Sequence, residues 1–359
     1  MLRVVSKNLF NFPLTGEMNE EVKAMDAQMQ QMMEASPEAK KVINRMKELE
    51  IKDDMESTME FLALVRASSE HFIGAISQNP ALNYGGEQTT TTFLKVPTSH
   101  DGEFDVPVEV YTPKELDNDT KKAAYIYAHG GGVIAFSAAD LRKGVQCIAV
   151  EMNVVAFNVD YRLAPETKCP NNIKDFYEVI KYVSENAESL GIDPTKIVIA
   201  GESGGGYICL GAMVLLAQKE EGHLVKLAIP GVPMVDDYCF SDPLAMTLEE
   251  RKAHLSVRKI WKDLVASDFE QQKNDPHLFP GKASKELLEK FPPTIILESE
   301  FDHFITEASR LANRLRRAGR LLEFVVFPGA NHMSSYMPGT QGNTVLVDTM
   351  KTIVKEYVH

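Results

Sequence analysis

Two glycine-rich runs hold the residues best suited to chemistry. Gly201-Glu-Ser-Gly-Gly-Gly206 places a serine between glycines, directly after the apolar run Lys196-Ile-Val-Ile-Ala200. His129-Gly-Gly-Gly132 follows a second apolar run, Ala123-Ala-Tyr-Ile-Tyr-Ala128. A serine hydroxyl attacks a carbonyl when a base removes its proton, and backbone N–H groups stabilise the oxyanion that forms. The two runs together therefore indicate acyl transfer from a serine nucleophile.

Ser203 is the expected nucleophile because its glycines suit a sharp turn from strand to helix. Such a turn strains the backbone at the serine, and Cβ atoms on the flanking residues would collide with neighbouring chain. We expect Gly201 and Gly205 to be needed for this reason. The G-x-S-x-G pattern alone is weak, since glycines flank some serines by chance. Its position after an apolar strand and before a helix makes it more specific.

The His129–Gly132 run is expected to form the other side of an oxyanion hole. We assign the donor amides to Gly131, Gly132 and Gly204. His129 and Gly130 are assigned to structural support of the glycine loop. A phosphate-binding loop is the rival interpretation, but no G-K-[ST] follows and no G-x-G-x-x-G occurs here.

A base and an acid must follow the serine if the usual order of this elbow holds, which is serine, acid, histidine. His332 is the expected base, because it follows the apolar run 322–327 on a loop at a strand's C-terminal end, where active-site residues of open parallel sheets gather. Asp302 is the expected acid, because it lies furthest into the loop after strand 294–297. Glu298 and Glu300 are its rivals. The other histidines after the serine are His223, His254, His277, His303 and His359.

The composition limits the partners of the chain. A net charge of −13 over 359 residues opposes binding to nucleic acid or to an anionic membrane surface. Four cysteines without a C-x-x-C pair indicate free thiols in a reducing compartment. The N-terminus lacks a signal-peptide stretch, and no apolar window is long enough to span a membrane. We therefore expect a cytoplasmic protein without stable membrane insertion.

The pattern of elements divides the chain near residue 92. Apolar spacing of three and four predicts helices over about 22–33, 42–49 and 55–76, followed by a polar break at 83–92. Beyond it, strands alternate with helices, which predicts an α/β fold with a mostly parallel sheet of about eight strands. Residues 236–293 lack a convincing strand. The predicted strands are 106–111, 123–128, 154–159, 196–200, 227–235, 294–297 and 322–327; the predicted helices are 138–151, 172–189, 205–220, 304–319 and 341–357.

These motifs resemble the hormone-sensitive-lipase family of carboxylesterases. The resemblance covers residues 93–359 and includes Asp160-Tyr-Arg-Leu-Ala-Pro-Glu166, which the family uses as a structural turn. It implies an α/β-hydrolase core at 93–359 and a helical cap, built from an N-terminal segment at 1–92 and an insertion at about 236–280. It also implies a serine carboxylesterase that acts on short- to medium-chain esters without a metal or organic cofactor.

Departures from the family pattern concern the shape of the pocket. Glu202 and Gly204 stand where Asp and Ala are commoner, Met333 replaces the usual Gly-Phe, and residues 133–137 lack a glycine. An amidase, deacetylase or lactonase would share every residue named above. A non-catalytic small-molecule receptor, like the gibberellin receptors of this family, would lack the histidine that is present at 332. Strand 322–327, as an uncovered sheet edge, could pair with a second copy in a homodimer.

Overall fold

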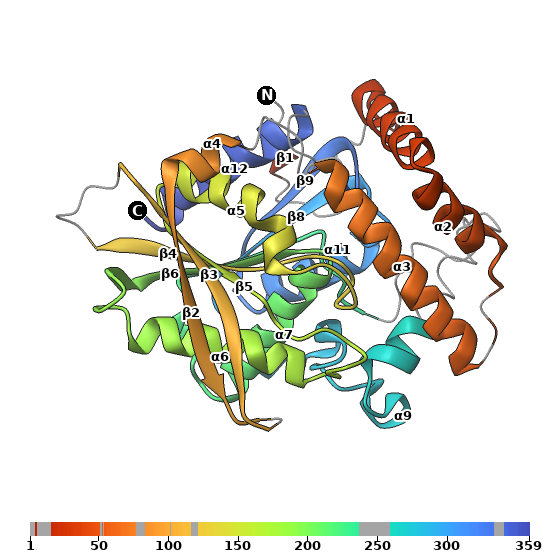
Figure 1. Cartoon of the computed structure of the whole chain (residues 1–359). Helices are drawn as coiled ribbons and strands as arrows, with labels where there is room; N and C mark the ends of the chain where they lie inside the picture. Colours follow the sequence, from red (N-terminus) through yellow and green to blue (C-terminus); the bar gives the residue numbers. More distant parts are fainter. Residues whose placement is uncertain are drawn as a thin grey trace.

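One twisted sheet organises the chain (Figure 1). The computed structural model describes residues 4–5, 16–50, 52, 54–76, 83–100, 102–115, 121–236, 259–333 and 341–359. Among these residues the sheet has nine strands in the order β1-β9-β8-β7-β6-β4-β5-β3-β2. Much of the expected cap insertion, residues 237–258, lies outside the described residues, and so do His254 and Cys239.

Six neighbouring strands run parallel and form the centre of the sheet. Their residues are apolar almost throughout because both faces are covered, as a parallel sheet requires. β1, β2 and β3 join antiparallel at the two ends. The bounds are β1 Val4–Val5, β2 Thr89–Thr98, β3 Phe104–Pro113, β4 Lys122–Ala128, β5 Val155–Val159, β6 Ile192–Glu202, β7 Leu227–Gly231, β8 Thr294–Phe301 and β9 Leu321–Asn331.

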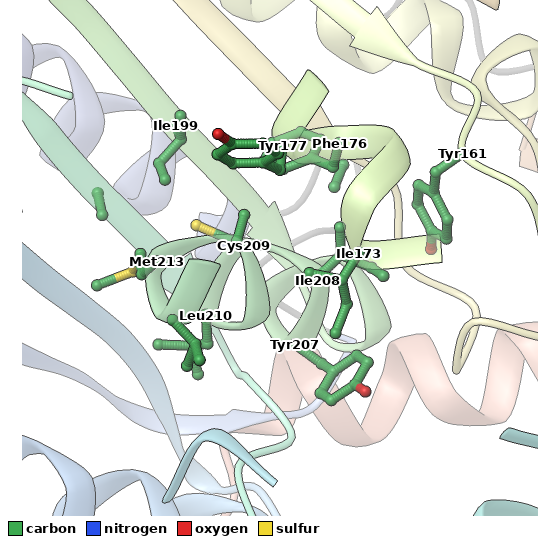
Figure 2. Packing of buried hydrophobic residues seen from close by; sticks show 14 of the residues in the cluster. Tyr161, Ile173, Phe176, Tyr177, Ile199, Tyr207, Ile208, Cys209, Leu210 and Met213 are labelled. Carbon is green, nitrogen blue, oxygen red and sulfur yellow. The ribbon is translucent and has the colours of Figure 1, made fainter. Parts of the chain in front are cut away.

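Helices cover both faces of the sheet (Figure 1). Alternate residues of β4 point to opposite faces: Tyr125 and Tyr127 pack with α5 and α12, whereas Ala124 and Ile126 belong to the core that contains α6, α7 and α11. Figure 2 shows part of this second core: Phe176 and Tyr177 of α6 lie beside α7, from which Tyr207, Leu210 and Met213 project. The bounds are α4 Asn83–Gln88, α5 Ala138–Met152, α6 Asn171–Glu185, α7 Gly204–Gln218, α9 Phe269–Gln272, α10 Lys285–Leu288, α11 Ile305–Arg317 and α12 Gln341–Tyr357, with short helical turns at Gly222–Leu224, Trp261–Val265 and Pro280–Lys282.

The N-terminal helices stand at one side of the sheet (Figure 1). They are α1 Glu20–Ala35, α2 Pro37–Glu48 and α3 Met55–Ile76, as the apolar spacing predicts. Arg66 of α3 donates to the carbonyl oxygens of Ile134 (2.8 Å) and Ala164 (3.0 Å), which fastens α3 to the loops after β4 and β5. Among the described helices, none is both long enough and apolar enough to cross a bilayer.

Three expectations about elements need correction. The predicted break at 83–92 is a short helix, α4, followed by strand β2, so the strands that follow the N-terminal helices begin at Thr89 rather than at about 93. Its threonines are polar but β-branched, and most are exposed on the outermost strand, which hid the strand from an apolar pattern. β7 ends at Gly231 rather than at 235. Strand 322–327 is not a fully uncovered edge, because β1 pairs with Val325 and Val326 of β9.

Candidate active site

Ser203 lies on a strained turn between β6 and α7. Its φ of 55° and ψ of −117° belong to a region that residues with a side chain rarely adopt, at a cost of about 1–3 kcal/mol. Cβ atoms added at Gly201 and Gly205 would lie 2.6 Å and 2.0 Å from the carbonyl oxygen of Ala128. The glycines therefore let the turn approach β4, and the Ser203 amide donates to the Gly231 carbonyl (2.9 Å).

A chain of hydrogen bonds joins the three residues expected to act together. Ser203 Oγ lies 3.0 Å from His332 Nε2, and His332 Nδ1 lies 2.6 Å from Asp302 Oδ2. Asp302 is buried, and its other oxygen accepts the amide of Phe304 at 2.8 Å. Since a carboxylate only accepts, Nδ1 carries the proton and Nε2 is free to accept from the serine hydroxyl. This arrangement can remove a proton from Ser203.

The glycine loop lies directly beside the elbow. A Cβ at Gly204 would stand 2.7 Å from the Gly132 nitrogen and 2.8 Å from the Val133 nitrogen. Gly131 and Gly132 have φ values of 103° and 62°, which favour glycine. The Gly131 carbonyl accepts the amides of Ile134 (3.1 Å) and Ala135 (3.0 Å), which closes the loop into a tight turn. The amides assigned as donors in the sequence thus belong to two segments in contact.

His129 is buried inside the loop rather than exposed to a substrate. Its Nδ1 lies 2.8 Å from the Gly130 carbonyl oxygen, and its ring stacks on Tyr161 with centroids 4.4 Å apart. The Tyr161 hydroxyl donates to the His129 carbonyl at 2.7 Å. Burial lowers the pKa of His129, which keeps the ring neutral. These contacts tie the glycine loop to the turn after β5.

Glu202 has a supporting position that the sequence did not reveal. One carboxyl oxygen accepts the Gly130 amide at 3.0 Å, and the other accepts the Tyr127 hydroxyl. Burial raises the pKa of Glu202 to about 7. The residue before Ser203 therefore holds the first glycine of the loop. The alternation of β6 was the available signal, because it turns Glu202 toward the same face as Val198 and Ala200.

The two rival acids are occupied elsewhere. Glu300 accepts the Gly16 amide at 2.9 Å and the Gly329 amide at 2.7 Å. Glu298 is buried with one oxygen accepting the Ser299 amide at 2.9 Å, and burial raises its pKa well above the usual range. Asp302 is the one that bonds His332.

Of the other histidines, His303 lies close to the site, with its ring centroid 5.0 Å from that of His332. Its side chain is partly exposed and contacts Phe304. Partial desolvation, followed by the charge of the neighbouring His332, lowers the pKa of His303 to about 4. Asp302, His303 and His332 could face one ion among the described residues, but two of them already bond within the Ser203 chain. His277 instead bonds Asp275 and Gln218.

Helix α1 and its N-cap Asn19 contact the end of β9, which leads directly to His332. The Asn19 amide donates to the Gly329 carbonyl at 3.0 Å, and the Asn19 side chain donates to the Pro328 carbonyl at 3.2 Å. Asn331 donates to Asp26 of α1 at 2.9 Å. Glu300 accepts the Gly329 amide of the same segment. Together these bonds hold the residues of β9 that directly precede His332.

Known proteins match both the sequence and the fold of this chain. The sequence profile of a family described as alpha/beta hydrolase fold matches residues 125–335, which is more than half of the chain. The chain belongs to this family. Within it, the relatives place the chain in the branch that resembles hormone-sensitive lipase.

Several relatives that match this hydrolase are named for ester hydrolysis. It is 26% identical over 245 residues to ethyl acetate hydrolase of Pseudomonas putida, covering 66% of this chain and 73% of that protein. It is 39% identical over 110 residues to carboxylesterase NlhH of Mycobacterium tuberculosis, covering 30% and 34%. Among solved structures, a bacterial heroin esterase matches with a TM-score of 0.72 and 26% identity, covering 90% of this chain and 98% of that one.

Proposed function

We propose that this hydrolase is a serine carboxylesterase that works through an acyl-enzyme. The observation that carries the proposal is the hydrogen-bonded chain from Ser203 through His332 to Asp302, with distances of 3.0 Å and 2.6 Å. The order serine, acid, histidine and the elbow at Ser203 agree with this class of enzyme. The esterase names of its relatives support the same reaction.

In the proposed mechanism, Ser203 Oγ attacks the ester carbonyl while His332 Nε2 takes the hydroxyl proton. The amides of Gly131, Gly132 and Gly204 stabilise the oxyanion of the tetrahedral intermediate. Protonated His332 then gives its proton to the leaving alcohol. A water molecule activated by His332 releases the acid and restores the serine. Asp302 stabilises the imidazolium and keeps its orientation.

The proposed substrates are small neutral esters with short to medium acyl chains. The names ethyl acetate hydrolase and acetyl esterase of two relatives support short acyl groups. An amidase or deacetylase is the second candidate, because a human relative, arylacetamide deacetylase-like 2, is 32% identical over 159 residues. Rates on p-nitrophenyl esters of increasing acyl length, beside the rate on p-nitroacetanilide, distinguish the two. A preference for the anilide would favour the second candidate.

The deciding experiment is Ser203→Ala assayed on p-nitrophenyl acetate. The expected loss in kcat is about 10⁴-fold or more, because a triad serine acts together with its base. His332→Ala should lose a similar factor, and the loss in the double variant should be no larger than in either single one. More than about a tenth of the wild-type rate in Ser203→Ala would reject the nucleophile.

We also propose that residues 1–92 and 236–280 form the cap and that the enzyme is cytoplasmic. The contacts of α1 with the His332 loop and of α3 with the loop after β4 support the cap. The free thiols Cys147, Cys169 and Cys209 suit a reducing compartment.

A further inference from the structure

A cavity of about 360 Å³ lies on the α5 and α12 face of the sheet, away from the Ser203 hydroxyl. Small-molecule sites have volumes of about 300–1,000 Å³. The described lining residues include Glu202 but neither Ser203 nor His332. Its walls are mostly apolar side chains, among them Ile148, Met152, Ile229, Leu297, Leu346 and Met350.

A glycine in the middle of α5 keeps part of this cavity open. Gly144 lines it, and a Cβ built there would meet no atom within 4 Å. A glycine inside a helix costs about 0.5–1 kcal/mol relative to alanine. Here neither a positive φ nor a close approach accounts for the glycine. The space beside it is therefore available to a ligand.

Three polar side chains of the sheet line the cavity, and one of them, the Tyr127 hydroxyl, already donates to Glu202. Tyr125 is buried, and no hydrogen bond of its hydroxyl is found among the described residues. Burial raises the pKa of Tyr125, and the nearby Glu202 raises it further, so the hydroxyl keeps its proton and remains a donor. Glu202 presents a carboxyl that can still accept. The hydroxyl oxygen is not fully enclosed by protein, so a ligand in the cavity can bond it.

The charges of the lining select among ligands. Glu151, Glu202 and Asp348 are acidic, and no lysine, arginine or histidine is found among the described lining residues. An anionic ligand would be repelled. A carboxylate cannot donate to Glu202, and an ammonium would lose its hydration in a mostly apolar cavity. A neutral hydroxyl can accept from Tyr125 and donate to Glu202.

We propose that this cavity is a second binding site, for a neutral alcohol with an apolar chain, in which the ligand hydroxyl bonds Tyr125 and Glu202. The site is separate from the one that hydrolyses esters, although Glu202 connects it to the glycine loop through Gly130. A bound alcohol therefore contacts the residue that holds the loop.

The test is a calorimetric titration of 1-octanol into the full chain, before and after a phosphonate has blocked Ser203. We expect one equivalent to bind in both states. Gly144→Leu, which fills the space, should weaken binding at least tenfold, whereas the matched Gly144→Ala should bind like wild type. Equal affinity of the two variants, or binding that phosphonate abolishes, overturns the proposal. If the phosphonate does not label Ser203, that result counts against the proposed esterase. The titration of the untreated chain still tests the cavity.

A second set of measurements tests the ligand chemistry without filling the cavity. Octanoate and octylammonium should bind at least tenfold more weakly than 1-octanol. Tyr125→Phe removes only the hydroxyl and should weaken 1-octanol about threefold to tenfold, the contribution of one hydrogen bond. Equal binding of all three ligands, or no effect of Tyr125→Phe, would show that the cavity does not recognise a hydroxyl.

Discussion

Around Ser203, neighbouring groups hold both Asp302 and the glycine loop in place. Asp302 is oriented by the Phe304 amide, and Gly130 is held by Glu202. Precise positioning of this kind contributes much of the rate in acyl transfer, because the donors are in place before charge develops. Mutation of the supporting residues is therefore as useful a test of the mechanism as mutation of the nucleophile.

Glu202 gives a prediction about pH. Its pKa is about 7 in the folded protein and 4.5 as a free side chain, so the folded state holds its proton to higher pH than the unfolded state. Stability should therefore fall as pH rises from about 4.5 to 7 and level off above. Glu202→Gln cannot ionise at this position. Between pH 5 and pH 8, its free energy of unfolding should therefore fall by up to about 3 kcal/mol less than that of the wild type. Urea unfolding at both pH values measures this, with the exposed Glu188→Gln as control. Identical pH dependence in wild type and Glu202→Gln would contradict it.

The residues of the site differ in how far the sequence could predict them. Ser203, His332 and Asp302 follow from short motifs and from the order of strands, and the structure brings their side chains together. Glu300 was considered only as a rival acid. Its partners, Gly16 and Gly329, lie 284 and 29 residues away, and no local pattern records such pairs.

At the scale of elements, apolar spacing predicts buried helices well and polar edge strands poorly. α1, α2 and α3 agree with the predicted ranges because each has an apolar stripe. β2 was missed because its stability comes from pairing with β3 over ten residue pairs rather than from its own burial pattern. Pairing across the chain is invisible in a local window.

The junction of β6 and α7 gives a prediction about glycines. Gly205→Ala would place a Cβ 2.0 Å from the Ala128 carbonyl oxygen, which rigid backbone cannot avoid. We expect a loss of about 3 kcal/mol or more in stability, together with lower activity. The matched change Gly144→Ala meets no neighbour and should stabilise by about 0.5–1 kcal/mol. Thermal unfolding of both variants is the measurement, and similar melting temperatures for the two would refute the steric argument.

The hydrogen bond between the Gly329 amide of β9 and Glu300 of β8 gives a prediction about kcat. Glu300→Ala leaves the buried Gly329 amide without its acceptor and loosens the end of β9, which leads to His332. We expect kcat on p-nitrophenyl acetate to fall about tenfold to a hundredfold, because small displacements of a catalytic base are costly. Stability should fall by about 1–3 kcal/mol. Lys23→Ala, on the exposed Lys23–Glu20 pair of α1, is the control. An unchanged kcat in Glu300→Ala would show that the end of β9 holds its position without the bond to Glu300.

At the scale of the whole molecule, net charge gives a prediction about substrates. A charge of −13 repels anions at long range, and salt screens that repulsion. kcat/KM for the anionic p-nitrophenyl hydrogen succinate should therefore rise severalfold between about 0.01 and 1 M NaCl. The neutral p-nitrophenyl acetate should change little over the same range. Parallel salt dependence of the two esters would exclude electrostatic steering.

The buried thiols have a consequence for studying motion in this molecule. Cys147 lies on α5, Cys169 on the loop before α6, and Cys209 on α7, and each is at most 7% exposed. Burial raises the pKa of Cys169 to about 12, so alkylating reagents cannot attack it until its surroundings open. With Cys239 replaced by serine, the rate at which each thiol is alkylated reports how often its own segment unfolds locally. A chain with this single substitution thus contains three separate reporters of local opening, with no attached label.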